Sequence, residues 1–140
     1  MQKVKEIEVH YSKEYQFDNV KITEASDAYN LFMKVWDDQL DYRESVNVMY
    51  LDRSNKVKFI NRHSTGSTTG SIIDAKQILA LALKTASECF IVAHNHPSGN
   101  LRASHADIKI CEKLKNASNT LDIQMHDFMI VTSESFTSII

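Results

Sequence analysis

The sequence predicts an α/β fold in which a mixed β-sheet is flanked by helices. Segments with a helical spacing of apolar residues alternate with strand-like segments along the 140 residues. Two strand patterns, at residues 46–51 and 57–60, are separated by a short polar turn and predict one tight antiparallel hairpin. Helical crossovers join parallel strands, whereas a hairpin joins antiparallel ones, so the sheet should contain both kinds of pairing.

The composition is that of one globular domain with a hydrophobic core. A formal net charge of −2 gives no general attraction to DNA or to an anionic membrane. Three glycines are too few for a P-loop or a dinucleotide-binding turn. Cys89 and Cys111 lie in regular structure without CxxC spacing, so we expect buried thiols of a reducing compartment.

The sequence contains no targeting or membrane signal that we can identify. No apolar run approaches the ~20 residues needed to cross a bilayer. The first residues lack the hydrophobic stretch of a signal peptide. We therefore expect a cytoplasmic protein.

The first half of the chain should hold an edge strand, a helix and the hairpin. Val4–Tyr11 alternates imperfectly between apolar and polar residues, which suggests the strand. The helix should begin at a Thr23 or Ser26 cap. Its apolar stripe comprises Ala28, Leu31, Phe32, Val35 and Trp36. Residues 63–71 are rich in Ser, Thr and Gly and predict a mobile loop.

The second half should contribute two helices and four strands. Asp74 and Gln77 resemble a capping box for a helix that ends near residue 86. Its inward stripe is Ile78, Leu79, Ala82 and Leu83. A buried strand at Cys89–Ala93 precedes a second helix, residues 104–117, with Ile108, Cys111 and Leu114 inward. Short strands are expected at residues 123–125, 128–132 and 136–139.

The run His94–Gly99, HNHPSG, is the feature around which the rest of the chain is organised. Residues two apart on a strand point to one side, so His94 and His96 should converge. Ser104 is a suitable helix N-cap, and residues three apart on a helix share a face. Asp107 can therefore face the two histidines.

Two imidazoles and one carboxylate form a three-ligand zinc set with a fourth position left for water, as in catalytic sites. We predict one Zn²⁺ bound by His94, His96 and Asp107. An isolated HxH pair is more often two surface histidines. Here the preceding strand, the turn and the phase of Asp107 favour the metal.

These residues resemble the JAMM (MPN/JAB-type) metalloprotease motif, and HNHPSG is similar to its RadC-like branch. The resemblance runs from about Arg43 to about Ser138. It implies a three-layer fold related to that of cytidine deaminases. We therefore divide the single domain, residues 1–140, into an N-terminal strand and helix (1–40) and a catalytic core (41–140).

The resemblance also implies catalytic roles. Glu44, just before the strand at residues 45–51, matches the family's general acid/base, and Glu88 is the second candidate. Ser104 matches the serine that stabilises negative charge on the substrate oxygen; the alternative is that it only caps its helix. Three further residues are candidates for supporting the ligands or lining the substrate rim: Ser98, Asp127 and His63.

The chain departs from the family's pattern at three places. Ala103 stands where a proline often precedes the serine, and Asp74-Ala75 replaces a Pro-Arg pair. Phe128 stands where a histidine often follows Asp127. None of these positions is a predicted ligand.

The leading hypothesis is a zinc hydrolase of amide bonds, with a peptide or protein substrate of unknown identity. A nucleic-acid-associated protein is the alternative from another class, because the RadC-like name is tied to DNA repair and mobile elements. A metal-bound scaffold without activity and a homo-oligomer also stay open. A zinc base deaminase would need cysteine ligands beside HxE, and no cysteine lies near this motif.

Overall fold

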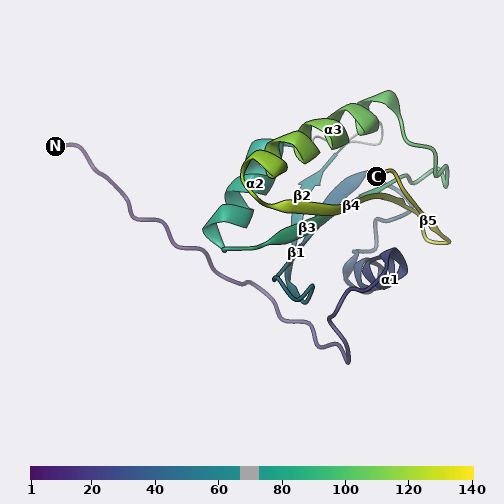
Figure 1. Ribbon diagram of the computed structural model, residues 1–140, viewed down its shortest axis with the longest axis horizontal. Helices are drawn as coiled ribbons and strands as arrows, with labels where there is room; N and C mark the ends of the chain where they lie inside the picture. The colour runs from purple at the N-terminus through teal and green to yellow at the C-terminus, as the bar shows by residue number, and fades with distance from the viewer. Residues whose placement is uncertain (67–72) are drawn as a thin grey trace.

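The computed structural model describes residues 1–66 and 73–140, which form an α/β fold (Figure 1). In these residues a five-stranded sheet has the order β2-β1-β3-β4-β5. Its strands are β1 (Ser45–Leu51), β2 (Val57–Thr65), β3 (Cys89–Asn95), β4 (Gln124–Val131) and β5 (Phe136–Ser138). Only the β3–β4 pair is parallel among the described strand pairs. The predicted mixed sheet and hairpin are confirmed.

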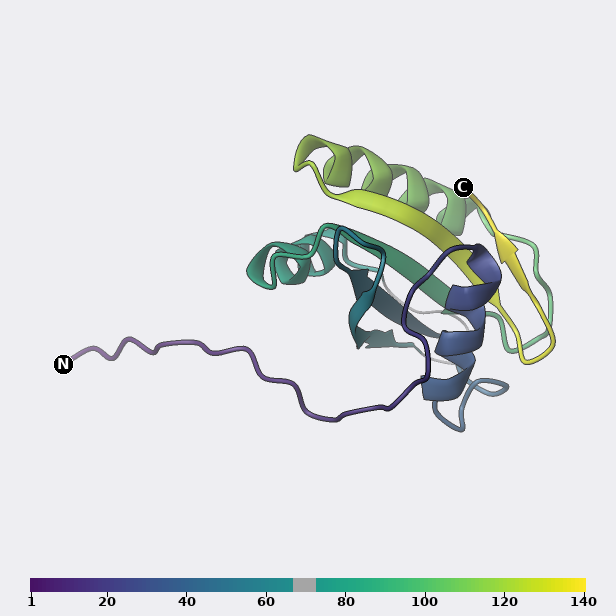
Figure 2. The ribbon, with the colours of Figure 1, turned by 60° about the horizontal axis from the view of Figure 1, so that its bottom comes forward.

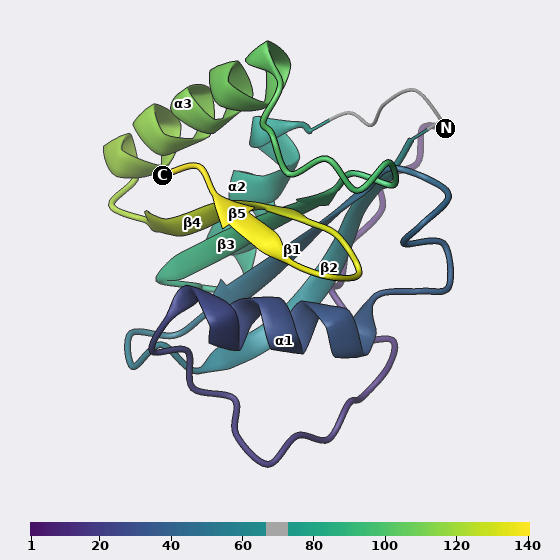
Figure 3. The same cartoon turned by 90° about the vertical axis from the view of Figure 1, so that its right-hand side faces the viewer.

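Helices cover both faces of the sheet and make three layers. Helix α1 (Ala25–Val35) lies on one face, and α2 (Ala75–Lys84) with α3 (His105–Thr120) lies on the other (Figure 3). Every residue of β1 and β3 is buried, because these central strands are covered on both sides. The predicted α/β fold with flanking helices is therefore confirmed.

Strand alternation divides the core into two clusters. Phe90 and Val92 of β3 pack with α2 and α3, whereas Ile91 and Ala93 pack with α1. Phe32 and Phe90 are fully buried, one in each cluster. Truncating either ring to alanine would cost about 3–5 kcal/mol of stability.

Polar residues before the helices fix where they begin. The Asp74 carboxylate accepts a hydrogen bond from the Lys76 nitrogen at 3.0 Å, so the predicted start of α2 is confirmed. The N-cap of α1 is Glu24, not Thr23 or Ser26. There the Asp27 carboxylate accepts bonds from the backbone nitrogens of Thr23 and Glu24.

The predicted N-terminal strand is wrong. Val4–Tyr11 forms no strand (Figure 2), although the centroid of the Tyr11 ring lies 5.9 Å from that of the Phe59 ring of β2. An alternating pattern specifies a strand only where a partner covers its apolar side. Among the described residues before β1, β-type pairing is limited to one isolated antiparallel bridge between Lys21 and Lys56.

Two apolar side chains expected in the core face solvent. Leu83 of α2 is 55% exposed and Ile108 of α3 is 46% exposed. Each lies at the border of its helix's apolar stripe. Successive residues are 100° apart around a helix, so a border position can face either the core or the solvent. Cys111 and Leu114 are buried as predicted, and both cysteines are free thiols.

Three boundaries also differ from the prediction. Residues 123–125 and 128–132 belong mostly to one continuous strand, β4, with a register irregularity opposite Phe90 and Ile91. Residues 63–65 extend β2, and positions 67–71 of the predicted loop lie outside the described residues. Helix α2 ends at Lys84, before Ala86 takes a left-handed φ of 52°. In residues 1–66 and 73–140, every helix is too short or too polar to span a bilayer.

Candidate metal centre

Strand register brings Glu44 and the two histidines together. His94 lies two residues beyond Val92 and therefore faces α3. Val46 of β1 pairs with His94 in antiparallel register, and Glu44 precedes Val46 by two residues on the same face. The backbone nitrogen of His96 donates to the Val131 carbonyl at 3.1 Å, which continues the β3–β4 pairing.

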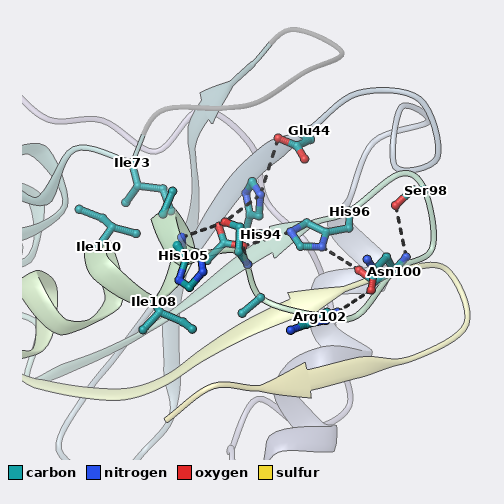
Figure 4. Close-up of a pocket in the computed structure, with 14 residues that line it drawn as sticks. Glu44, Ile73, His94, His96, Ser98, Asn100, Arg102, His105, Ile108 and Ile110 are labelled. Atoms are coloured by element: carbon teal, nitrogen blue, oxygen red, sulfur yellow. Dashed lines mark hydrogen bonds and ion pairs between the residues drawn. The ribbon is translucent and has the colours of Figure 1, made fainter.

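Glu44, His94 and His96 point toward one another in Figure 4, and Asp107 lies beside both histidines. Nε2 of His96 lies 3.3 Å from Asp107 Oδ2, and Nε2 of His94 lies 3.9 Å from Asp107 Oδ1. Glu44 Oε2 lies 3.8 Å from Nε2 of His94. The structure thus brings together the three predicted ligands and the predicted acid/base.

These separations suit one metal ion. Two tetrahedral zinc ligands, each bonded at about 2.0–2.1 Å, lie roughly 3.3 Å apart. The separation between His96 Nε2 and Asp107 Oδ2 matches this value, whereas His94 Nε2 lies 3.9 Å from the other oxygen of Asp107. Ligand atoms of Glu44, His94 and His96 also lie within 4.8 Å of one another and could hold an ion. Glu44 is therefore close enough either to bind the metal or to act on its open side.

The backbone orients the His96 ring. Its Nδ1 lies 2.7 Å from the Asn100 carbonyl oxygen. A carbonyl accepts only, so Nδ1 carries the proton and Nε2 points into the site, as metal-binding histidines usually do. Asn100 was not among the residues predicted from the sequence.

A capping box fixes Asp107 at the start of α3. Its Oδ2 accepts a bond from the Ser104 nitrogen at 2.8 Å, while Ser104 Oγ accepts from the Asp107 nitrogen at 3.0 Å. The predicted cap at Ser104 is confirmed. Because Ser104 Oγ is an acceptor here, its own hydrogen stays free to donate toward the site, so capping does not exclude a second role.

Burial and mutual contact shift the pKa values of the three predicted ligands in different directions. Burial lowers the pKa of His94 to about 4, so this ring is neutral at pH 7. A hydrogen bond to Asp107 raises the pKa of His96. Burial raises the pKa of Asp107, but hydrogen bonds from His96 and Ser104 outweigh it and bring that pKa to about 2. An ionised carboxylate beside a neutral imidazole is a donor set that zinc prefers.

Asn95, between the two histidines, fixes the segment that carries Glu44. The residue is fully buried and faces away from its histidine neighbours. Its Oδ1 accepts from the Ser45 nitrogen at 2.6 Å. Its Nδ2 donates to the carbonyls of Leu40 and Arg43 at 2.7 and 2.9 Å. The only sequence signal for this role was a polar residue on the inner face of an otherwise apolar strand.

A pocket of about 850 Å³ opens over the centre. Ser98 lines it, which agrees with its predicted place at the rim, and its Oγ accepts from the Asn100 nitrogen. His105 also lines it but is exposed at the helix N-terminus.

Other candidate residues lie outside this pocket. Nε2 of His63 accepts from the Asp74 nitrogen at 2.8 Å, so His63 supports the start of α2 and does not line the pocket. The Asp127 carboxylate accepts from the Ser138 hydroxyl and holds β5. Glu88 lies at the opposite end of β3, 3.6 Å from Arg53, so of the two acid/base candidates Glu44 is the one at the site.

Comparison with known proteins places this site in a family context. The RadC-like JAB domain family matches residues 22–140. A UPF0758 protein of Flavobacterium johnsoniae is 34% identical over 120 residues, which cover 86% of this chain and 52% of that protein. UPF0758 proteins of Staphylococcus epidermidis and Haemophilus ducreyi are 33% and 30% identical, over 89% and 91% of this chain and 54% and 58% of theirs. The chain thus spans about half the length of these curated relatives.

Proposed function

Because the chain belongs to the RadC-like JAB domain family, we propose that it is a zinc-dependent hydrolase of amide bonds in peptides or proteins. His94, His96 and Asp107 would hold the metal. The observation that carries this proposal is the placement of the Glu44 carboxylate 3.8 Å from His94 Nε2, within the group of Glu44, His94 and His96 that could hold a cation. An acidic group at that distance is positioned to exchange a proton with a water in the pocket.

Zinc in such a site supplies a Lewis acid that lowers the pKa of water to about 7. Glu44 would take a proton from the attacking water and return it to the leaving nitrogen. Its place before β1 is fixed by the Asn95 hydrogen bonds, so the carboxylate needs little reorganisation to act.

Ser104 would act on the substrate carbonyl. Its hydroxyl hydrogen can donate to the carbonyl oxygen as negative charge develops there, while Oγ still accepts from Asp107. The α3 N-terminus adds its positive dipole end at the same place.

The test compares the wild type with Glu44→Gln, using zinc analysis and a screen of peptide and isopeptide substrates. Glutamine keeps the size of the side chain but cannot accept a proton at neutral pH. We expect unchanged zinc content and loss of cleavage by at least ~100-fold.

Each other result has a clear meaning. Loss of zinc from Glu44→Gln would make Glu44 a ligand instead of the acid/base. Cleavage that survives the substitution contradicts the mechanism. Zinc binding without cleavage of any substrate in either protein would favour the non-catalytic scaffold.

A further inference from the structure

The pocket over the metal centre has two chemically different sides. Ile73, Ile108 and Ile110 lie together on one side of His94 in Figure 4. Asn100 lies beyond His96 on the other side, and Arg102 lies below His96, next to Asn100. A substrate bound across the histidines would therefore contact an aliphatic wall at one end and a cation at the other.

The aliphatic wall is open to a ligand. Ile108 follows Asp107 directly and is 46% exposed, although it was expected to lie inward. Ile73 and Ile110 pack against the α2–α3 core cluster and so have fixed positions. A single exposed isoleucine has no special meaning, but an exposed one continuing a rigid apolar wall beside polar groups is typical of a binding pocket.

The cationic side is tied to the metal centre. Arg102 is the one Lys or Arg lining the pocket among the described residues, and no carboxylate pairs with it in that part of the chain. Its backbone nitrogen donates to Asn100 Oδ1 at 2.9 Å, and the Asn100 carbonyl contacts Nδ1 of His96. The arginine's backbone position is thus fixed relative to His96.

We propose that the pocket recognises an amide flanked by an aliphatic side chain on one side and a carboxylate on the other. The aliphatic group packs on Ile73, Ile108 and Ile110, and the carboxylate pairs with Arg102. This inference rests on the proposed function, because the metal sets where the amide lies.

Binding of metal-chelating probes tests it without requiring turnover. Isothermal titration of the zinc-loaded protein would compare N-acetyl-leucine N-methylhydroxamate, N-acetyl-alanine N-methylhydroxamate and N-acetyl-leucyl-N-hydroxyglycine, whose carboxylate lies on the nitrogen side of the hydroxamate. We expect the acetyl-leucine probe to bind about tenfold more tightly than the alanine probe. The glycine carboxylate should improve the affinity of the leucine probe by about threefold at low salt.

Two variants assign these gains to residues. Ile108→Ser should abolish most of the leucine preference, whereas Leu83→Ser, a similarly exposed residue on α2, should leave it unchanged. Arg102→Gln should abolish the gain from the glycine carboxylate, whereas substitution of Arg53, which lies beside Glu88, by Gln should not.

The outcomes separate the two proposals. If zinc and the acetylated probes bind but the side chain and carboxylate change nothing, the substrate inference is wrong and the metal centre stands. The substrate inference is also wrong if the affinity gains between probes persist in Ile108→Ser and Arg102→Gln. Failure of the wild type to retain zinc overturns the proposed function and this inference together.

Discussion

The Oδ1 atom of Asn95 accepts a 2.6 Å hydrogen bond from the backbone nitrogen of Ser45, 50 residues earlier in the chain. His94, its immediate neighbour, contacts Glu44, the neighbour of Ser45, at 3.8 Å. The two adjacent pairs lie on opposite faces of the sheet because strand side chains alternate. The Asn95–Ser45 hydrogen bond therefore fixes the backbone that carries His94 and Glu44.

Asn95→Ala should therefore destabilise the fold. It removes an acceptor and leaves the carbonyls of Leu40 and Arg43 without their amide donor. We expect a loss of about 2–4 kcal/mol in the free energy of unfolding, measured by urea denaturation. Asn116→Ala, at an exposed position of α3, is the control and should change stability little. A loss below ~0.5 kcal/mol for Asn95→Ala contradicts this role.

Asp107→Asn should weaken zinc binding without unfolding α3. Asparagine can still accept the Ser104 bond as part of the cap, but it lacks the negative charge of the ligand. We expect zinc affinity to fall by at least ~100-fold in a competition titration with a chelator. Asp27→Asn changes the matching cap residue of α1 and should leave zinc affinity unchanged. Equal losses in the two variants would mean that capping, not coordination, explains the effect.

Ser104→Gly should separate the two roles of this hydroxyl. Glycine at an N-cap costs only a few tenths of a kcal/mol relative to serine, so stability should hardly change. Removing one hydrogen-bond donor to the substrate oxygen should lower kcat by about 10²–10³ with a smaller change in KM. Steady-state kinetics on a substrate found in the screen would measure both constants. An unchanged kcat would restrict Ser104 to capping.

Zinc should stabilise the folded protein. An ion that binds only the folded state adds about 2.7 kcal/mol at a concentration 100 times its Kd. We expect the midpoint of thermal unfolding to rise with zinc and to return after chelation. His94→Ala should remove this response, whereas His105→Ala, in the same pocket but exposed, should retain it. A zinc response that His94→Ala retains would place the ion elsewhere.

As the pH decreases, the metal-free protein should lose stability, partly because of His63. Burial lowers the pKa of His63 below its ordinary value of 6.5, although Asp74 opposes this, and Nε2 must be unprotonated to accept from the Asp74 nitrogen. Below pH 6.5 the unfolded chain binds a proton that the folded chain does not, so the stabilisation is present above pH 6.5 and is lost as pH falls through the folded pKa. Urea denaturation at pH 7.5 and 5.5 should show a smaller difference for His63→Asn than for the wild type. His10→Asn, at an exposed position, should behave as the wild type.

Most of the fold could be predicted from helix caps and residue spacing, which depend on residues close together in the sequence. Asp74 capped its helix as expected, and the spacing of His94, His96 and Asp107 brought these three side chains together. Those relationships depend on periodicity over a few residues. The placement of Glu44 depended on a family resemblance, since no local pattern links it to His94.

Features that depend on distant partners were missed. Val4–Tyr11 has a strand-like pattern but no partner strand, and Ile108 has a core-like position but lies at the pocket. Asn95 is hydrogen-bonded to a segment about 50 residues away, which no spacing rule reveals.

The alternation along β3 also limits how this strand can change in length. Adding or removing one residue between Cys89 and His94 would turn every later side chain to the opposite face. The imidazole would then point into the hydrophobic layer beneath α1, and the amide of Asn95 would point at the cation. Insertions should be tolerated between the exposed turn residues Arg53 and Ser54, where a changed length leaves both faces of β3 as they are.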